Sequence, residues 1–97
     1  MTLLERDQKV IWHPYTQHGL EESPLPAKSA KGAWITLENG QKILDAISSW
    51  WVNIHGHAHP ALSKTLSEQA EVLDHILFAG FTHEPAVKLA EILIRAK

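Results

Sequence analysis

An asparagine-glycine pair, Asn39-Gly40, lies between two runs of β-prone residues, and it constrains the fold of this 97-residue chain more than any other feature. The dipeptide readily takes the positive φ angles of a two-residue hairpin turn, which would place Ile35 opposite Leu44. One face of such a hairpin gathers Ala33, Ile35, Leu37, Leu44 and Ala46. The other face carries Trp34, Thr36, Ile43 and Asp45. The sequence therefore predicts an antiparallel β-hairpin with a distinct core side.

Two adjacent tryptophans, Trp50 and Trp51, follow the hairpin after a pair of serines. If the run that starts at Ile43 continues as a strand to Trp51, side-chain alternation sends the two indoles to opposite faces. One ring would then fill a core, and the other would face a ligand or an interface. The alternative is that both tryptophans are packing residues of a small domain.

Helical patterns lie on both sides of the hairpin. Thr2 and Glu5 have the spacing of a capping box, which predicts a helix over 3–11. A second helix of about five turns should begin at His59-Pro60 and end at Gly80. Its apolar stripe consists of Leu62, Leu66, Ala70, Leu73 and Leu77.

A last helix is expected to start within 82–85, and it is apolar over more than half of its circumference. Such a helix is normally buried on two sides. It reaches Arg95-Ala96-Lys97 without a glycine, asparagine or proline that would stop it. This pattern favours a chain cut from a longer protein; the alternative is that Lys97 serves as a favourable charge at a helix end.

The segment 13–29 contains three prolines and Gly19 and few apolar residues, so we expect an extended loop that lies against a larger body. Within it, Pro14 fixes one φ angle and can aim Tyr15 at a defined place. A tyrosine ring offers a stacking surface and a hydroxyl for a planar ligand. Equally, Tyr15 could simply pin the loop to that body.

Composition excludes several classes of function. Nine basic and 11 acidic residues give a net charge of −2 with no basic run, so no nucleic acid or membrane partner is expected. The absence of cysteine excludes disulfides and thiolate chemistry, and it is compatible with the cytoplasm. The start of the chain, 1–7, becomes charged at once and is unlike a signal peptide.

Catalytic patterns are missing from the sequence. The five glycines are scattered rather than grouped in a phosphate-binding loop, and the seven lysines stand in polar surroundings. His55, His57 and His59 could share one face and approach zinc or nickel, but Gly56 and Pro60 favour a bend there. We therefore predict no catalytic, cofactor-binding or metal-binding residue, and keep a free-standing histidine-rich binding module as an alternative.

A family resemblance rests on residues that occur in order along the whole chain. These are Trp12-His13-Pro14-Tyr15-Thr16, the Asn39-Gly40 hairpin with Leu44-Asp45-Ala46, Ser48-Ser49-Trp50-Trp51, His55-Gly56 with His59-Pro60, and Phe78-Ala79-Gly80-Phe81-Thr82-His83. They resemble the N-terminal segment of class III, ornithine-type aminotransferases. The tryptophan-histidine-proline-tyrosine-threonine segment and the double tryptophan are most similar to the diaminopelargonic acid synthases of biotin biosynthesis.

The resemblance implies an α+β segment of a fold-type I transferase, with an N-terminal helix, an antiparallel hairpin and two further helices. Residues 1–97 would be a small-domain segment that leads into an absent large domain. The parent enzyme would be a cytoplasmic, pyridoxal-phosphate-dependent homodimer. It would transfer an amino group to 8-amino-7-oxononanoate from S-adenosylmethionine, or from lysine as in some relatives.

The resemblance also implies the roles of three side chains. Tyr15 would recognise the keto substrate and stack on the adenine of the donor. Trp50 would line the same site, and Trp51 would pack inward. The family's phosphate-binding turn, pyridine-pairing aspartate, Schiff-base lysine and carboxylate-binding arginine lie beyond position 97, so the chain alone should be inactive and hold no cofactor. Another class III enzyme acting on an ω-amino acid or on ornithine remains the nearer alternative.

Overall fold

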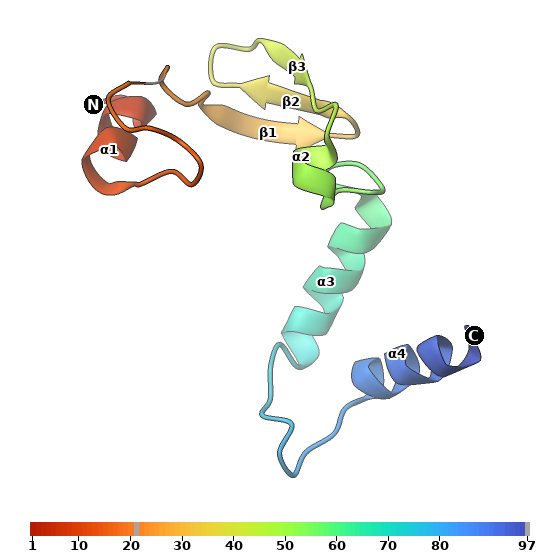
Figure 1. The fold of residues 1–97 in the computed structure, drawn as a ribbon. Coiled ribbons are helices and arrows are strands. Elements are labelled where there is room, and N and C mark those ends of the chain that lie inside the picture. The colour runs from red at the N-terminus through yellow and green to blue at the C-terminus, as the bar shows by residue number, and fades with distance from the viewer. Residues whose placement is uncertain (21, 97) are drawn as a thin grey trace. The chain divides into compact units, whose positions relative to one another are not determined.

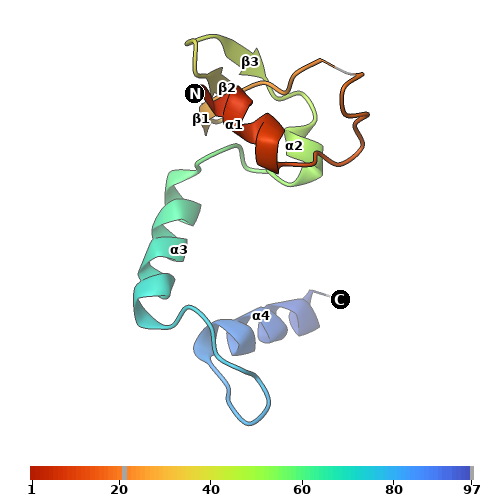
Figure 2. The same cartoon turned by 90° about the vertical axis from the view of Figure 1, so that its left-hand side faces the viewer.

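A computed structural model of the chain describes residues 1–20 and 22–96. It divides the chain into two compact units, Met1–Leu62 and a second that begins at Ser63. The order of elements is one helix, three strands, a short helical turn and two longer helices, as Figures 1 and 2 show. The predicted α+β class, with an N-terminal helix, an antiparallel pairing and two later helices, is confirmed.

Helix α1, Leu3–Val10, begins at the predicted capping box. The backbone N–H of Glu5 donates to Thr2 Oγ1 at 3.2 Å, and the N–H of Thr2 donates to Glu5 Oε2 at 2.7 Å. Both donors would otherwise lack a partner at a helix start, so the pair fixes where α1 begins. The chain is already extended at Ile11, one residue earlier than expected.

Three strands form one antiparallel sheet in the order β1, β2, β3, with bounds Ala27–Lys31, Trp34–Leu37 and Lys42–Leu44. Strand β1 was not predicted, since part of it fell within the loop expected over 13–29. Its sequence is short and mainly polar and has no apolar alternation to reveal it. Backbone pairing with β2 defines it, with Ala30 opposite Ile35 and Lys31 opposite Trp34.

The predicted hairpin exists, but its predicted register is wrong by one residue. Ile35 lies opposite Ile43 rather than Leu44, and the Leu37 N–H donates to the Gln41 carbonyl at 2.8 Å. The loop therefore has three residues, and Gly40 takes a φ of +86° at its end. This is the turn-plus-bulge form of hairpin, in which the glycine supplies the left-handed position.

The one-residue shift decides which side chains share a face. Leu37 is only 4% exposed and is the one buried hydrophobic residue among residues 1–20 and 22–96. Leu44, expected on the same face, is instead 53% exposed. Ile43 takes its place opposite Ile35 and is partly buried.

The condition for side-chain alternation at the tryptophan pair, a strand that continues to Trp51, is not met. Strand β3 ends at Leu44, and Ser48–Trp51 form the short helical turn α2. All four residues have positive φ angles, between 47° and 68°, so the turn is left-handed. Side-chain alternation does not apply to it, and Trp51, expected to pack inward, is 76% exposed.

Helix α3, Pro60–Val72, begins as predicted but ends well before Gly80. The side-chain amide of Gln69 donates to the Leu73 carbonyl at 2.8 Å, and the N–H of His75 donates to Asp74 Oδ1 at 2.7 Å. Local side-chain bonds of this kind compete with helix continuation. The predicted fifth turn, which included Leu77, is therefore wrong.

Helix α4, Glu84–Arg95, starts where expected. His83 caps it, because its Nδ1 accepts the N–H of Ala86 at 3.3 Å, and Pro85 occupies the first turn. The expectation that α4 is buried on two sides is not met within the described chain, where none of its residues is buried. The predicted charge at Lys97 lies outside the described residues.

Candidate functional site

The structure brings together the two side chains that the sequence singled out, Tyr15 and Trp50. Their ring centroids lie 5.0 Å apart, and the ring planes meet at 66° in an edge-to-face contact. This is a preferred geometry for aromatic pairs. Both rings remain largely exposed, so the pair presents a bare aromatic surface that a planar or apolar ligand could contact.

Tyr15 is placed by short-range contacts in the loop that follows α1. His13 Nε2 lies 2.8 Å from Asp7 Oδ2, which ties the loop back to the helix. The Thr16 hydroxyl donates to the His13 carbonyl at 2.7 Å and closes a turn around Pro14. Tyr15 itself has a φ of +54°, an uncommon value for a tyrosine.

Trp50 is placed by the left-handed turn α2. A left-handed conformation costs a non-glycine residue roughly 1–2 kcal/mol, so four in a row need support from their surroundings. Within the turn, the Trp51 N–H donates to the Ile47 carbonyl at 2.8 Å, and the Val52 N–H donates to the Ser48 carbonyl at 3.0 Å. Further support comes from a carboxylate just before the turn.

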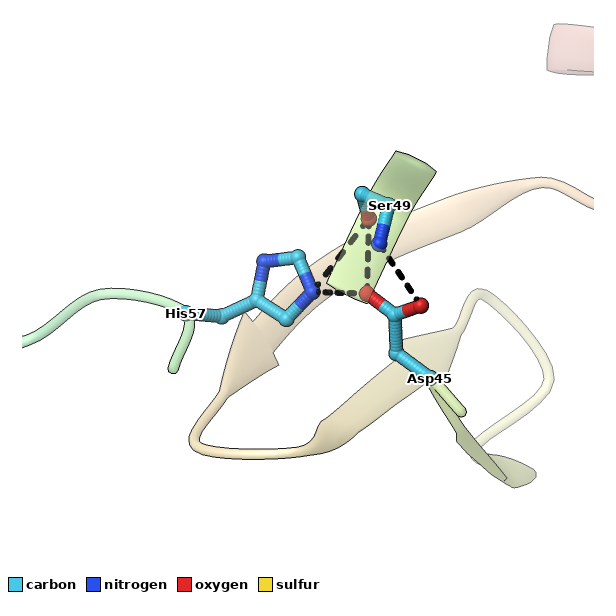
Figure 3. Close-up of polar contacts among 3 residues, drawn as sticks. All are labelled: Asp45, Ser49 and His57. Atoms are coloured by element: carbon cyan, nitrogen blue, oxygen red, sulfur yellow. Dashed lines mark hydrogen bonds and ion pairs between the residues drawn. The ribbon is translucent and has the colours of Figure 1, made fainter. Parts of the chain in front are cut away.

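That carboxylate belongs to Asp45, as Figure 3 shows. Oδ1 of Asp45 accepts the Ser49 backbone N–H at 2.8 Å, while Oδ2 accepts the Ser49 hydroxyl at 2.7 Å. His57 Nε2 lies 2.6 Å from the same Oδ2. The Asp45 side chain is 6% exposed, so water does not compete strongly for these bonds.

The hydrogen bonds change the acidity of Asp45. The Ser49 backbone N–H, the Ser49 hydroxyl and the His57 ring together lower the pKa of Asp45 from its ordinary value of 3.8 to about 2. Each of them stabilises the ionised carboxylate more than the neutral acid. Asp45 is therefore a fixed negative charge at neutral pH.

Asp45, Ser49 and His57 are the residue types of a hydrolase triad, but their geometry is different. An ionised carboxylate only accepts hydrogen bonds, so the His57 Nε2 that faces Asp45 must carry a proton. That nitrogen is also the one 3.4 Å from Ser49 Oγ, and a protonated nitrogen cannot take the serine proton. The three residues are therefore suited to holding the turn rather than to activating a nucleophile.

This cluster was not predicted from the sequence. Asp45 was placed on the hairpin face opposite the predicted core side and was part of the family resemblance without a role of its own, and His57 was grouped with His55 and His59 as a candidate metal ligand. Asp45 and His57 are twelve positions apart, and no periodic pattern links residues across two turns. The spacing of four between Asp45 and Ser49 was the one available signal, since it lets an aspartate reach the backbone of a following turn.

The metal alternative gains no support from the described residues. His57 is paired with Asp45, and His59 Nδ1 accepts the Ala61 N–H at 3.2 Å. In residues 1–20 and 22–96, no group of three histidine, cysteine or acidic side chains is placed to hold a metal ion. Nor is any described helix long and apolar enough to cross a membrane.

The first unit contains cavities, and two of them bear on the site. The smaller, about 200 Å³, lies against the cluster and is lined by Asp45, His57 and the backbone around Gly32 and Gly56. The larger, about 390 Å³, lies between α1 and the following loop, and neither Tyr15 nor Trp50 lines it. The aromatic pair lines neither of these two cavities, and both of its rings are exposed.

Comparison with known proteins defines the class of this chain. The family model described as aminotransferase class-III matches residues 15–97. The chain therefore belongs to the class III aminotransferase family.

Individual relatives carry a more particular name. The chain is 49% identical over 80 residues to the adenosylmethionine-8-amino-7-oxononanoate aminotransferase of Synechococcus elongatus, covering 82% of this chain and 19% of that protein. It is 44% identical over 93 residues to the enzyme of the same name from Corynebacterium glutamicum, covering 96% of this chain and 22% of that protein. The chain thus spans about a fifth of the length of these relatives.

Solved structures of family members share the fold of this chain. The adenosylmethionine-8-amino-7-oxononanoate aminotransferase of Methanocaldococcus jannaschii superposes with a TM-score of 0.89 at 32% identity, over 98% of this chain and 22% of that one. An omega transaminase from Pseudomonas jessenii, crystallised with PMP, gives a TM-score of 0.91 at 29% identity, over 100% of this chain and 22% of that one. The fold is therefore shared across the family and does not by itself separate its activities.

Class III aminotransferases use pyridoxal phosphate, but the described residues do not fit that group. Schiff-base chemistry needs a lysine removed from water, and every described lysine is exposed. Lys64 and Lys88, for example, form surface pairs with Glu68 and Glu84. The close approach at Gly56 is to the backbone of Gly32, so it is not a cradle open to a phosphate.

Proposed function

We propose that this chain is the N-terminal, substrate-facing segment of an aminotransferase that converts 8-amino-7-oxononanoate to 7,8-diaminononanoate in biotin biosynthesis. S-adenosylmethionine is the proposed amino donor. The parent enzyme is proposed to be a cytoplasmic homodimer that uses pyridoxal phosphate. The segment alone is proposed to be inactive and to hold no cofactor.

The observation that carries this proposal is the contact between Tyr15 and Trp50. The two residues are 35 positions apart in sequence, yet their rings meet and stay exposed. An aromatic surface of this kind suits an adenine ring or the alkyl chain of a keto substrate, and the Tyr15 hydroxyl adds one hydrogen-bonding group. Tyr15 and Trp50 are thus the proposed substrate-contacting residues.

The names of the relatives favour this substrate over others in the family. Identity to the adenosylmethionine-8-amino-7-oxononanoate aminotransferases of Synechococcus elongatus and Corynebacterium glutamicum is 49% and 44%. Among the superposed structures, identity is 32% for the Methanocaldococcus jannaschii enzyme of that name and 29% for the Pseudomonas jessenii omega transaminase. An ω-amino acid transaminase segment remains the second candidate, because its fold match is as good. The substrate test below separates the two.

A chimera provides the test of function. In this chimera, the whole chain replaces the matching residues of the Corynebacterium glutamicum relative. The alignment of the two proteins covers 96% of this chain. We expect the chimera to bind pyridoxal phosphate, seen by its visible absorbance, and to transfer an amino group to 8-amino-7-oxononanoate from S-adenosylmethionine. The same assay with lysine as donor decides between the two donors.

The variants Tyr15→Ala and Trp50→Ala are then compared in that chimera. We expect KM for 8-amino-7-oxononanoate or the donor to rise about tenfold or more, the loss of about 1.4 kcal/mol of binding, with the cofactor absorbance unchanged. Unchanged kinetics in both variants would sink the assignment of these residues. A chimera active only on ω-amino acids would support the second candidate instead.

A further inference from the structure

The cluster of Asp45, Ser49 and His57 has no part in the proposed function so far. The three residues make four contacts between 2.6 and 3.4 Å, three of them between side chains and one from the Ser49 backbone N–H to Asp45. It also adjoins the turn that carries Trp50. The inference below rests on the proposed function, because it concerns the orientation of a proposed substrate contact.

The turn α2 cannot be held by packing of its own side chains. Trp50 and Trp51 are both exposed, and none of the four turn residues is buried. Their backbone is left-handed throughout, a conformation that L-residues leave unless neighbouring groups hold it. The direction of the Trp50 ring therefore depends on what fastens the turn to the rest of the unit.

Asp45 holds the turn α2 to the rest of the unit. Its two carboxylate oxygens accept both donors of Ser49, the residue immediately before Trp50. A carboxylate that accepts two hydrogen bonds from one residue fixes the orientation of that residue as well as its position. Figure 3 shows Ser49 and the His57 ring both directed at the Asp45 carboxylate.

His57 ties Asp45 to a second, independent anchor. The backbone of His57 exchanges two hydrogen bonds with Gly32, of 3.0 and 2.8 Å, in an isolated antiparallel bridge beside the sheet. The His57 ring is only 16% exposed and so keeps a defined direction toward Asp45. A series of hydrogen bonds therefore connects the sheet to the residue before Trp50. It runs from Gly32 to His57, from His57 to Asp45 and from Asp45 to Ser49.

We infer that Asp45 is a positioning residue for the substrate contact of Trp50, holding the left-handed turn so that the Trp50 ring meets Tyr15. His57 supports it by fixing the carboxylate. In this proposal Asp45 acts through Trp50 and makes no contact of its own with substrate or cofactor. Its loss should therefore change the aromatic surface first and leave the rest of the fold in place.

The 97-residue chain offers a direct measurement, because Tyr15 is its one tyrosine. With ring-labelled tyrosine, nuclear Overhauser contacts between Tyr15 and the Trp50 ring report the pair, and Trp50→Leu assigns them. We expect the contact to be lost in Asp45→Ala, weakened in His57→Gln and kept in His55→Gln. His55 is the matched control, since it lies in the same segment, is exposed and does not contact Asp45. A contact absent from the unmodified chain, or unaffected by Asp45→Ala, would overturn the inference.

A double-mutant cycle in the chimera tests the link to substrate. We expect Asp45→Asn to raise KM about tenfold while kcat changes less than about twofold, since only the orientation of a binding group is lost. In a Trp50→Ala background the same substitution should change KM by less than about twofold, because its target is gone. Additive effects would contradict an action through Trp50.

The two experiments separate the possible failures. If Trp50→Ala leaves KM unchanged, the proposed function fails at this residue, and the spectroscopic result still decides whether Asp45 orients the ring. If Trp50→Ala raises KM but Asp45→Ala leaves the aromatic contact intact, the proposed function stands and the inference is wrong.

Discussion

Gly56 and Gly32 pass so closely that a Cβ atom built on Gly56 would lie 3.0 Å from the Cα of Gly32 and 3.3 Å from its carbonyl carbon. The two hydrogen bonds between Gly32 and His57 draw the segments together. Gly56 also has a φ of +84°. Two separate reasons therefore require glycine at this position.

The substitution Gly56→Ala should destabilise the first unit by more than the roughly 1–2 kcal/mol that a left-handed alanine costs alone. Because the obstructing atoms are backbone, they cannot turn aside. The matched control is Gly40→Ala, whose φ of +86° is nearly the same but whose added Cβ meets nothing within 4 Å. Urea unfolding of the chimera measures both, and equal losses would show that the close approach has no energetic effect.

Leu37 provides a second prediction, because it is the buried hydrophobic residue of the described chain. Leu37→Ala should lower the free energy of unfolding by about 2–5 kcal/mol, the usual range for a buried leucine. Leu44→Ala, on the half-exposed side of the same hairpin, should cost clearly less. A larger loss at Leu44 would favour the two-residue hairpin register over the observed one.

The pKa of Asp45 determines the lowest pH at which the cluster still stabilises the fold. Its folded pKa of about 2 lies below the ordinary 3.8, so the stabilisation is fully present above about pH 4 and is lost as the pH falls toward 2. A carbon-13 titration of the Asp45 carboxyl in the chain should show this low midpoint. Ser49→Ala should raise it by removing one hydrogen bond, whereas a midpoint that stays near 3.8 in the unmodified chain would contradict the cluster.

Tyr15→Phe separates the two roles proposed for the tyrosine. The phenylalanine ring can keep the edge-to-face contact with Trp50, so the aromatic surface should survive. Only the hydroxyl is lost, and KM in the chimera should rise less than for Tyr15→Ala. Equal kinetic effects of the two substitutions would mean that the hydroxyl, rather than the ring, makes the contact with substrate.

Local patterns in the sequence were sufficient for several elements. The capping box at Thr2 and Glu5 and the proline after His59 predicted where α1 and α3 begin, because capping is decided by residues within one turn. The Asn39-Gly40 pair predicted a hairpin correctly but gave the wrong register. The same dipeptide suits both two-residue and three-residue loops, and backbone pairing over the whole strand chooses between them.

The site depended on contacts that local patterns do not contain. Tyr15 and Trp50 were identified as separate candidates, but nothing in their spacing predicted that the rings would meet. The Asp45–His57 pair was missed because it exists only after the chain has made a left-handed turn, and alternating strand geometry was assumed there instead. Four successive non-glycine residues with positive φ are too rare for propensity rules to suggest.

That turn also has a stereochemical consequence. Its backbone angles are the mirror image of an ordinary helical turn, so Ser48–Trp51 is the one stretch of described chain that D-amino acids would suit better than L-amino acids. Glycine would relax the turn as well, but it would remove the indole of Trp50 or the Ser49 hydroxyl that donates to Asp45. The chain therefore keeps bulky L-residues in the conformation least natural to them, and the fold around Asp45 must hold them there.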